Sequence, residues 1–249
     1  MATWITHMII ADKVLELFPQ LDKRGFCVGN IGPDCNEPNE DGTDFIPPRK
    51  VTHWMTGEKK KPSDTDIFYR EYFVKHSEDY DSKEYYSFLL GYYSHLITDA
   101  DFQWFIREPG RVRTAWDRVK ADERYKTKID TQEETWDTFK RVVTSKEIQR
   151  ERDALEAEYL RNHPDYECSY FTEILPLKDF PDYVDYLPRR GIVRKIPLMQ
   201  YMPVFDPELN PVGFSREEFY FLLDYIVRNI ERTFRRYDLL HDRRLKVDE

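Results

Sequence analysis

Residues 82–106 read Ser-Lys-Glu-Tyr-Tyr-Ser-Phe-Leu-Leu-Gly-Tyr-Tyr-Ser-His-Leu-Ile-Thr-Asp-Ala-Asp-Phe-Gln-Trp-Phe-Ile. This is the most apolar long helical pattern in the chain, with apolar side chains on nearly every side of the expected helix. Such a helix usually lies at the centre of a fold. Within it, His95 and Asp99 stand four residues apart, which is about one helical turn. Both side chains therefore project from one face and can bind a single ion.

Helical patterns also flank this central segment. Two capping signatures, Thr131 with Glu134 and Ser215 with Glu218, predict the starts of two of these helices. The helices expected besides the central one cover residues 4–18, 66–74, 131–143, 146–162 and 215–236. The nine glycines are too few for a loop-rich β-sandwich, whose tight turns repeatedly need glycine. We therefore predict an all-α fold, a multi-helical bundle with long irregular loops that forms a single domain over residues 1–249.

Two segments rich in proline or glycine interrupt these patterns. Residues 29–64 predict a long irregular connection, and such loops in compact domains are usually either functional or disordered. Residues 164–214 predict an extended segment that wraps the surface with little regular structure. The sequence does not indicate what this second segment does.

The overall charge restricts the partners of the chain. A net charge of −9 and a pI near 5.3 disfavour nucleic acid as a partner, because binding to a phosphate backbone depends on clustered Lys and Arg. Cys27, Cys35 and Cys168 are odd in number and widely spaced, which indicates free thiols in a reducing compartment. Neither a secretory signal pattern nor a transmembrane segment is recognisable, so we expect a cytoplasmic protein.

Five residues of metal-ligand type stand in the first hundred positions: His7, Asp34, His53, His95 and Asp99. Neutral imidazole and carboxylate are ligands that suit Zn²⁺. Each residue alone also has an ordinary structural interpretation. His95 and Asp99 are a common hydrogen-bonded pair, His7 is compatible with a core histidine, Asp34 with a turn residue, and His53 with a solvated loop side chain.

The sequence around these residues is more specific than the residues alone. A histidine in the first helix precedes Gly29-Asn-Ile-Gly-Pro-Asp34, Thr52-His53-Trp54 and Gly91-Tyr-Tyr-Ser-His95-x-x-x-Asp99. In this order the segments resemble the zinc-dependent phospholipase C family, which shares an all-α fold with single-strand-specific zinc nucleases. The resemblance covers about the first 105 residues. It implies that Asp34, His53, His95 and Asp99 bind one zinc ion, with Asp99 able to bridge to a second ion bound by His7.

Two departures from this family pattern limit the number of ions. The secreted three-zinc members use the amino group of an N-terminal tryptophan as a ligand, whereas Trp4 is internal here. They also supply a later His-x-x-x-Glu, whose nominal counterpart, His163 with Glu167, is interrupted by Pro164. The sequence therefore supports one or two Zn²⁺ ions and leaves a third unsupported.

The resemblance implies a metal-dependent hydrolase of phosphoesters similar to phospholipase C. The expected substrate is a small phosphoester or a phospholipid headgroup, and Asp34 is the ligand that we nominate as a catalytic proton acceptor. Two alternatives stay open at this point. The first is a single-strand-specific zinc nuclease of the same fold, and the second is a non-enzymatic protein in which the ion holds the 29–64 loop to the helices. The sequence does not indicate the oligomeric state.

Overall fold

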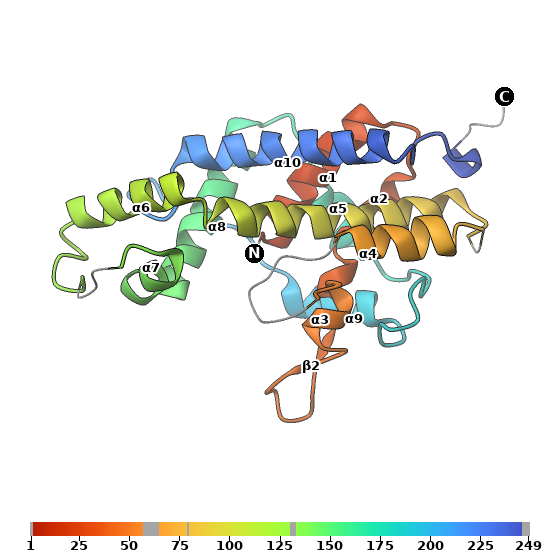
Figure 1. Cartoon of the computed structure of the whole chain (residues 1–249), viewed down its shortest axis with the longest axis horizontal. Helices are drawn as coiled ribbons and strands as arrows, with labels where there is room; N and C mark the ends of the chain where they lie inside the picture. Colours follow the sequence, from red (N-terminus) through yellow and green to blue (C-terminus); the bar gives the residue numbers. More distant parts are fainter. Residues whose placement is uncertain (1, 57–64, 79, 130–132, 246–249) are drawn as a thin grey trace. The chain divides into compact units, whose positions relative to one another are not determined.

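The computed structural model describes residues 2–56, 65–78, 80–129 and 133–245. These residues are mostly helical (Figure 1), and within them the one sheet is a short antiparallel ladder. In this ladder Glu37 of β1 (Glu37–Pro38) pairs with Ile46 of β2 (Phe45–Ile46). The predicted all-α fold is confirmed.

The chain divides into two compact units. The first contains residues 1–101, 167–200 and 225–249, and the second contains residues 102–166 and 201–224. Two long helices, α5 (Lys83–Phe105) and α10 (Arg216–Arg236), contribute residues to both units. The single domain expected over residues 1–249 stays a prediction.

The first unit carries all five candidate ligands. Besides its parts of α5 and α10 and the two strands, its elements are α1 (Trp4–Leu17), α2 (Lys23–Gly29), η1 (Gly32–Asp34), α3 (Arg49–Thr52), α4 (Thr65–Tyr69), η2 (Arg70–Lys75), η3 (Tyr170–Ile174), α9 (Gly191–Met199) and η4 (Arg243–Leu245). The helices expected over residues 4–18, 66–74 and 82–106 are present as α1, α4 with η2, and α5.

Two glycines bring the backbones of α2 and α5 into direct contact. A Cβ atom added at Gly91 would lie 2.0 Å from the carbonyl oxygen of Phe26, and one at Gly29 would lie 2.1 Å from that of Phe88. Real side chains do not tolerate such distances, so only glycine permits this close approach. The contact fixes where α2 ends and η1 begins, and η1 carries Asp34.

The second unit contains α6 (Pro109–Ala121), α7 (Trp136–Val142) and α8 (Ser145–Asn162) together with its parts of α5 and α10. The capping box at Ser215 and Glu218 is confirmed, since each backbone N–H bonds to the side chain of the other residue. The box expected at Thr131 with Glu134 stays a prediction. Thr131 lies outside the described residues, and α7 begins at Trp136 behind a cap formed by Thr135 and Thr138.

The segment 164–214 contains more regular structure than predicted. It includes the π-helical turn η3 and the helix α9, which continues past Pro197. The prediction of little regular structure is therefore wrong for α9, although residues 201–214 form no helix. The proline within this segment argued against a helix. In the structure α9 buries one side against the protein, including Ile192 and Ile196, and leaves Leu198 on the exposed side.

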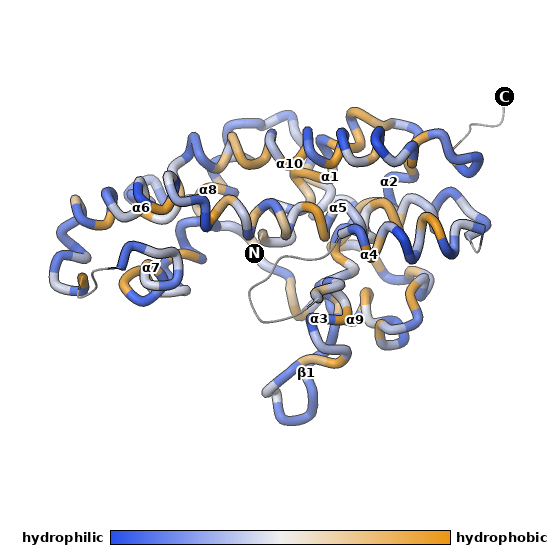
Figure 2. The backbone as a smooth tube through the Cα atoms, viewed as in Figure 1, coloured by the Kyte–Doolittle hydropathy of each residue, from blue (hydrophilic) through white to orange (hydrophobic). Residues whose placement is uncertain are grey.

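Helix α9 lies beside the β1–β2 hairpin (Figure 1). The Lys195 ammonium donates a hydrogen bond to the carbonyl oxygen of Asn36 (2.6 Å), and Arg194 forms an ion pair with Glu37 (2.7 Å). The turn that joins the two strands is hydrophilic (Figure 2). Among the described helices, none combines the length and the apolar character that a membrane crossing requires. The cytoplasmic location stays a prediction.

Candidate metal centre

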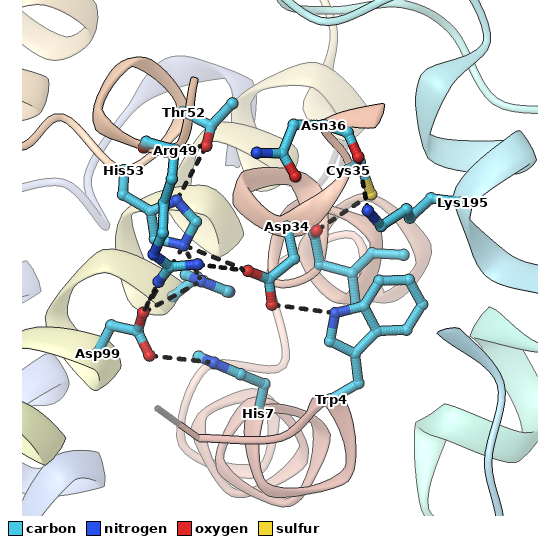
Figure 3. A network of polar contacts seen from close by, with 12 residues as sticks. Trp4, His7, Asp34, Cys35, Asn36, Arg49, Thr52, His53, Asp99 and Lys195 are labelled. Atoms are coloured by element: carbon cyan, nitrogen blue, oxygen red, sulfur yellow. Dashed lines mark hydrogen bonds and ion pairs between the residues drawn. The ribbon is translucent and has the colours of Figure 1, made fainter. Parts of the chain in front are cut away.

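The five candidate ligands meet in the first unit, and Figure 3 labels His7, Asp34, His53 and Asp99 among them. His7 comes from α1, Asp34 from the end of η1, His53 directly follows α3, and His95 and Asp99 come from α5. They form two overlapping groups, one of His7, His95 and Asp99 and one of Asp34, His53 and His95. Within each group the donor atoms lie within 4.8 Å of one another. The sequence prediction that these residues are neighbours in space agrees with the structure.

Several pairs of donor atoms have a spacing close to that of ligands in a tetrahedral zinc site. The His53 Nε2 atom lies 3.3 Å from Asp34 Oδ1 and 3.4 Å from His95 Nε2. The Oδ2 atom of Asp99 lies 3.7 Å from His53 Nε2 and 3.9 Å from His95 Nε2. With zinc–ligand bonds of about 2.0–2.2 Å, neighbouring donors in a tetrahedron lie about 3.3–3.6 Å apart. Asp34, His53 and His95 thus form one group that can share an ion, and Asp99, which belongs to the other group, lies within 3.9 Å of both imidazole nitrogens.

The hydrogen bonds of the two imidazoles favour metal binding through Nε2. The Nδ1 atom of His95 lies 2.7 Å from the carbonyl oxygen of Asn30, which only accepts, so Nδ1 carries the hydrogen. Thr52 donates its hydroxyl hydrogen to the carbonyl oxygen of Arg49 (3.3 Å), which leaves its oxygen free to accept from His53 Nδ1 (2.9 Å). Both rings can then turn the Nε2 lone pair to the same point. Two lone pairs 3.4 Å apart repel unless a proton or a cation lies between them.

The loop that carries Asp34 and His53 is fastened to the helices on both sides. The Tyr92 hydroxyl on α5 donates to the carbonyl oxygen of Thr52, immediately before His53. The Trp4 indole Nε1 on α1 donates to Asp34 Oδ2 (3.1 Å). These bonds orient the two loop ligands before any ion binds, as outer-shell partners do in metal proteins.

The protonation states also suit a cation. Burial, aided by the neighbouring His7, lowers the pKa of His95 to about 3, so this imidazole is neutral at pH 7 and able to coordinate. Burial alone would raise the pKa of Asp34 and of Asp99. Their contacts with the imidazoles and with Arg49 outweigh burial and hold both pKa values well below the usual range. Both carboxylates are therefore ionised at neutral pH.

Sequence reasoning missed Arg49. Its guanidinium Nη1 lies 3.1 Å from Asp34 Oδ1 and its Nη2 lies 2.6 Å from Asp99 Oδ2 (Figure 3). These are the same two oxygens that lie close to the imidazole nitrogens. A signal was present, because Arg49 stands four residues before His53 at the start of a short helix that follows two prolines.

His7 provides one donor for a neighbouring position. Its ring is fully buried and stacks on His95 with 3.9 Å between the ring centroids. Its Nε2 lies 3.7 Å from Asp99 Oδ1, which is too long for a hydrogen bond, and neither ring nitrogen has a hydrogen-bond partner among the described residues. A buried imidazole without partners costs free energy unless another group satisfies it. An ion bridged by Asp99 Oδ1 fits this requirement, although His7 and Asp99 alone do not complete its coordination.

The remaining candidates lie elsewhere. His163 ends α8, where its Nδ1 bonds to the carbonyl oxygen of Tyr159 (2.8 Å) and its ring stacks on Tyr159. It belongs to neither donor group of the described residues. The thiol of Cys35, next to Asp34, donates to the carbonyl oxygen of Ile31, and all three cysteines are buried and free. The prediction of free thiols is therefore confirmed.

Comparison with known protein families agrees with this geometry. Residues 6–102 match the family described as zinc dependent phospholipase C. Over these residues the chain is similar to the zinc-dependent phospholipase C family. The matched segment contains all five candidate ligands. No curated protein and no solved structure matches the chain with significance.

Proposed function

We propose that this protein is a zinc-dependent phosphoester hydrolase that acts on a phosphodiester or phosphomonoester, as the phospholipase C family name suggests. One observation carries the proposal. The Nε2 atoms of His53 and His95 lie 3.4 Å apart, Asp34 Oδ1 lies 3.3 Å from His53 Nε2, and Asp99 Oδ2 lies 3.7 Å and 3.9 Å from the two nitrogens. Zinc held by such a set acidifies a bound water and acts as a Lewis acid toward phosphoryl oxygens.

The protein residues divide the remaining tasks. The contacts with Thr52 and with the carbonyl oxygen of Asn30 fix the positions of the His53 and His95 rings. The solvent-facing side of the centre is formed by Asp34 and Arg49, whose side chains are 14% and 33% exposed, whereas His95 and Asp99 are at most 5% exposed. A substrate would therefore approach past Asp34 and Arg49.

Asp34 remains our nominee for the residue that accepts a proton. It is the carboxylate nearest to solvent, and its Oδ2 is held by Trp4. Its pKa lies well below the usual range because contacts with His53 and Arg49 outweigh the effect of burial. A carboxylate of low pKa is a weak base, so the main contribution of Asp34 is as a ligand.

The donor chemistry favours a catalytic ion over a purely structural one. Structural zinc sites in proteins are mostly built from cysteines, and catalytic sites from histidine and carboxylate. Cys35 is adjacent to Asp34 in sequence, yet its thiol bonds to the carbonyl oxygen of Ile31. Zinc can also expand to five ligands, so four protein donors still leave a place for water.

The experiment compares metal content and hydrolysis in wild type, Asp99→Asn and Asp101→Asn. Asp101 is a matched control, because it lies on the same helix but bonds to Asn229 (2.7 Å) and belongs to neither donor group. The substrates are a short-chain phosphatidylcholine, a phosphomonoester and a single-stranded oligonucleotide. We expect zinc-dependent hydrolysis of a phosphoester in wild type and Asp101→Asn, and loss of zinc and activity in Asp99→Asn.

The same experiment separates the alternatives. Cleavage of the oligonucleotide alone would replace the phospholipase C-like proposal with a nuclease of the same fold. Stoichiometric zinc without hydrolysis of any of the three substrates would favour an ion that only holds the loop. Full zinc content in Asp99→Asn would contradict the proposed centre itself.

A further inference from the structure

Arg49 is the basic side chain that contacts the metal centre in the described part of the chain. It is held in place by the two ion pairs with Asp34 (3.1 Å) and Asp99 (2.6 Å). Each uses one N–H on a different terminal nitrogen. A guanidinium has five N–H donors in a planar fork, so three remain. One third of the side chain is exposed, so Arg49 lies where the centre meets solvent.

From the positions of these donors, we infer that Arg49 forms a phosphoryl-binding site at the open edge of the centre. The inference rests on the proposed function and deepens it, because it names the group that recognises the anionic part of the substrate. A guanidinium group can bind two phosphate oxygens at once through parallel N–H bonds. The ion pairs with Asp34 and Asp99 hold the Arg49 guanidinium in one orientation for such binding.

The distances place Arg49 within reach of such a group. Its terminal nitrogens lie 2.6 Å and 3.1 Å from the two carboxylate oxygens of the donor set. An ion bonded to either oxygen at about 2.0–2.2 Å would therefore lie at most about 5 Å from the nearest guanidinium nitrogen. A phosphoryl group that contacts the ion through one oxygen can contact Arg49 through another.

The charges favour an anion only when Arg49 is present. A zinc ion carries two positive charges, and the two carboxylate ligands that would hold it carry two negative charges, so the loaded centre without Arg49 has no net charge. The guanidinium adds one positive charge on the side that faces solvent. Arg49 thus changes the zinc-loaded centre from neutral to attractive for a phosphate ester.

The test measures anion binding, not hydrolysis. Zinc-loaded wild type, Arg49→Gln and Arg49→Lys are titrated with inorganic phosphate and with dimethyl phosphate by calorimetry, at saturating zinc and with metal content measured. Lys50→Gln is the matched control, because Lys50 is the next residue of α3 and is exposed. We expect Arg49→Gln to weaken phosphate binding about 10- to 100-fold, and Lys50→Gln to change it less than twofold.

A second readout reports Arg49 directly. The ¹⁵N signal of its side-chain Nε–H, assigned by its disappearance in Arg49→Lys, should shift as phosphate is added and saturate with the same Kd. Arg49→Lys keeps the positive charge but lacks the planar set of N–H donors. Its affinity for phosphate should therefore fall between those of wild type and Arg49→Gln. If Arg49→Gln weakens the binding of both anions, the site accepts diesters and monoesters. If it weakens the binding of inorganic phosphate alone, the site is specific for monoesters.

Two results have different consequences. If Arg49→Gln holds zinc and binds phosphate within twofold of wild type, or if the Arg49 signal does not move while phosphate binds, the inference about Arg49 is overturned. If zinc-loaded wild type binds neither anion, the proposed phosphoester function is overturned instead.

Discussion

Replacing Gly91 with alanine tests whether the contact between α2 and α5 positions the metal centre. In an isolated helix this change is stabilising by about 1 kcal/mol, because alanine has the highest helix propensity and glycine a low one. In this protein the new Cβ would lie 2.0 Å from the carbonyl oxygen of Phe26, 2.9 Å from its carbonyl carbon and 3.1 Å from its Cα. All three are backbone atoms, so no side chain can move aside.

The magnitude follows from these distances. The two helices must separate by about 1 Å or more, and overpacking of this kind costs about 1–3 kcal/mol. The hydrogen bond from His95 to the carbonyl oxygen of Asn30, 2.7 Å long, lies one residue beyond α2 and would stretch past its useful range. Its loss adds about 0.5–1.5 kcal/mol. Less the gain of about 1 kcal/mol in helix propensity, we expect a net destabilisation of about 0.5–3.5 kcal/mol. Zinc affinity should be about 10- to 100-fold weaker because an outer-shell partner is lost.

Urea unfolding of the metal-free protein gives the first quantity, and a zinc titration against a competing chelator gives the second. Gly110→Ala on α6 is the control, because its Cβ would meet only the flexible side chain of Glu108, at 3.1 Å. The control should stay within about 1 kcal/mol of wild type. A Gly91→Ala variant as stable as wild type, with undiminished zinc affinity, would refute the role assigned to this helix contact.

Three further outcomes are expected. Trp4→Phe removes the indole donor to Asp34 Oδ2 (3.1 Å) and should weaken zinc binding about 10- to 100-fold in a titration, with little change in far-ultraviolet circular dichroism. Removal of zinc with a chelator should lower Tm, since free zinc at 100 times its Kd stabilises the folded state by about 2.7 kcal/mol; an unchanged Tm would contradict specific binding. Burial raises the pKa of Glu151, which accepts hydrogen bonds from the Val212 and Gly213 amides (2.9 Å and 2.8 Å). The folded state thus binds this proton more tightly than the unfolded state, so the contribution of Glu151 to stability falls as pH rises from the ordinary glutamate value through the raised one. Glu151→Gln should lower stability and remove this part of the slope in urea titrations across that range, and an unchanged slope would contradict it.

The central helix and its ligand pair followed from the sequence alone. Helical periodicity fixes the relative direction of His95 and Asp99, so no tertiary information was needed to place them on one face of α5. The family pattern added His7, Asp34 and His53, whose convergence depends on the path of the loop. The structure shows this path, and its fastening by Trp4 and Tyr92, which periodicity does not encode.

Short helices were the main omission. Helix α2 has seven residues and contains glycine, so its helical pattern is weak, and its stability comes from the backbone contact with α5. Helix α6 begins with Pro109 behind a Glu108 cap, a start signal that the sequence did contain. Arg49 was missed for a different reason. Its contacts with Asp34 and Asp99 join residues 15 and 50 positions away, and only the folded loop brings them together.

Anomalous diffraction from crystals of the zinc-loaded protein, recorded on both sides of the zinc absorption edge, tests the metal centre most directly. We expect a peak about 2.0–2.2 Å from the Nε2 atoms of His53 and His95 and from carboxylate oxygens of Asp34 and Asp99. The absence of a peak among these four side chains, or a zinc ion bound only elsewhere in the chain, would contradict the proposed centre and the hydrolase that depends on it.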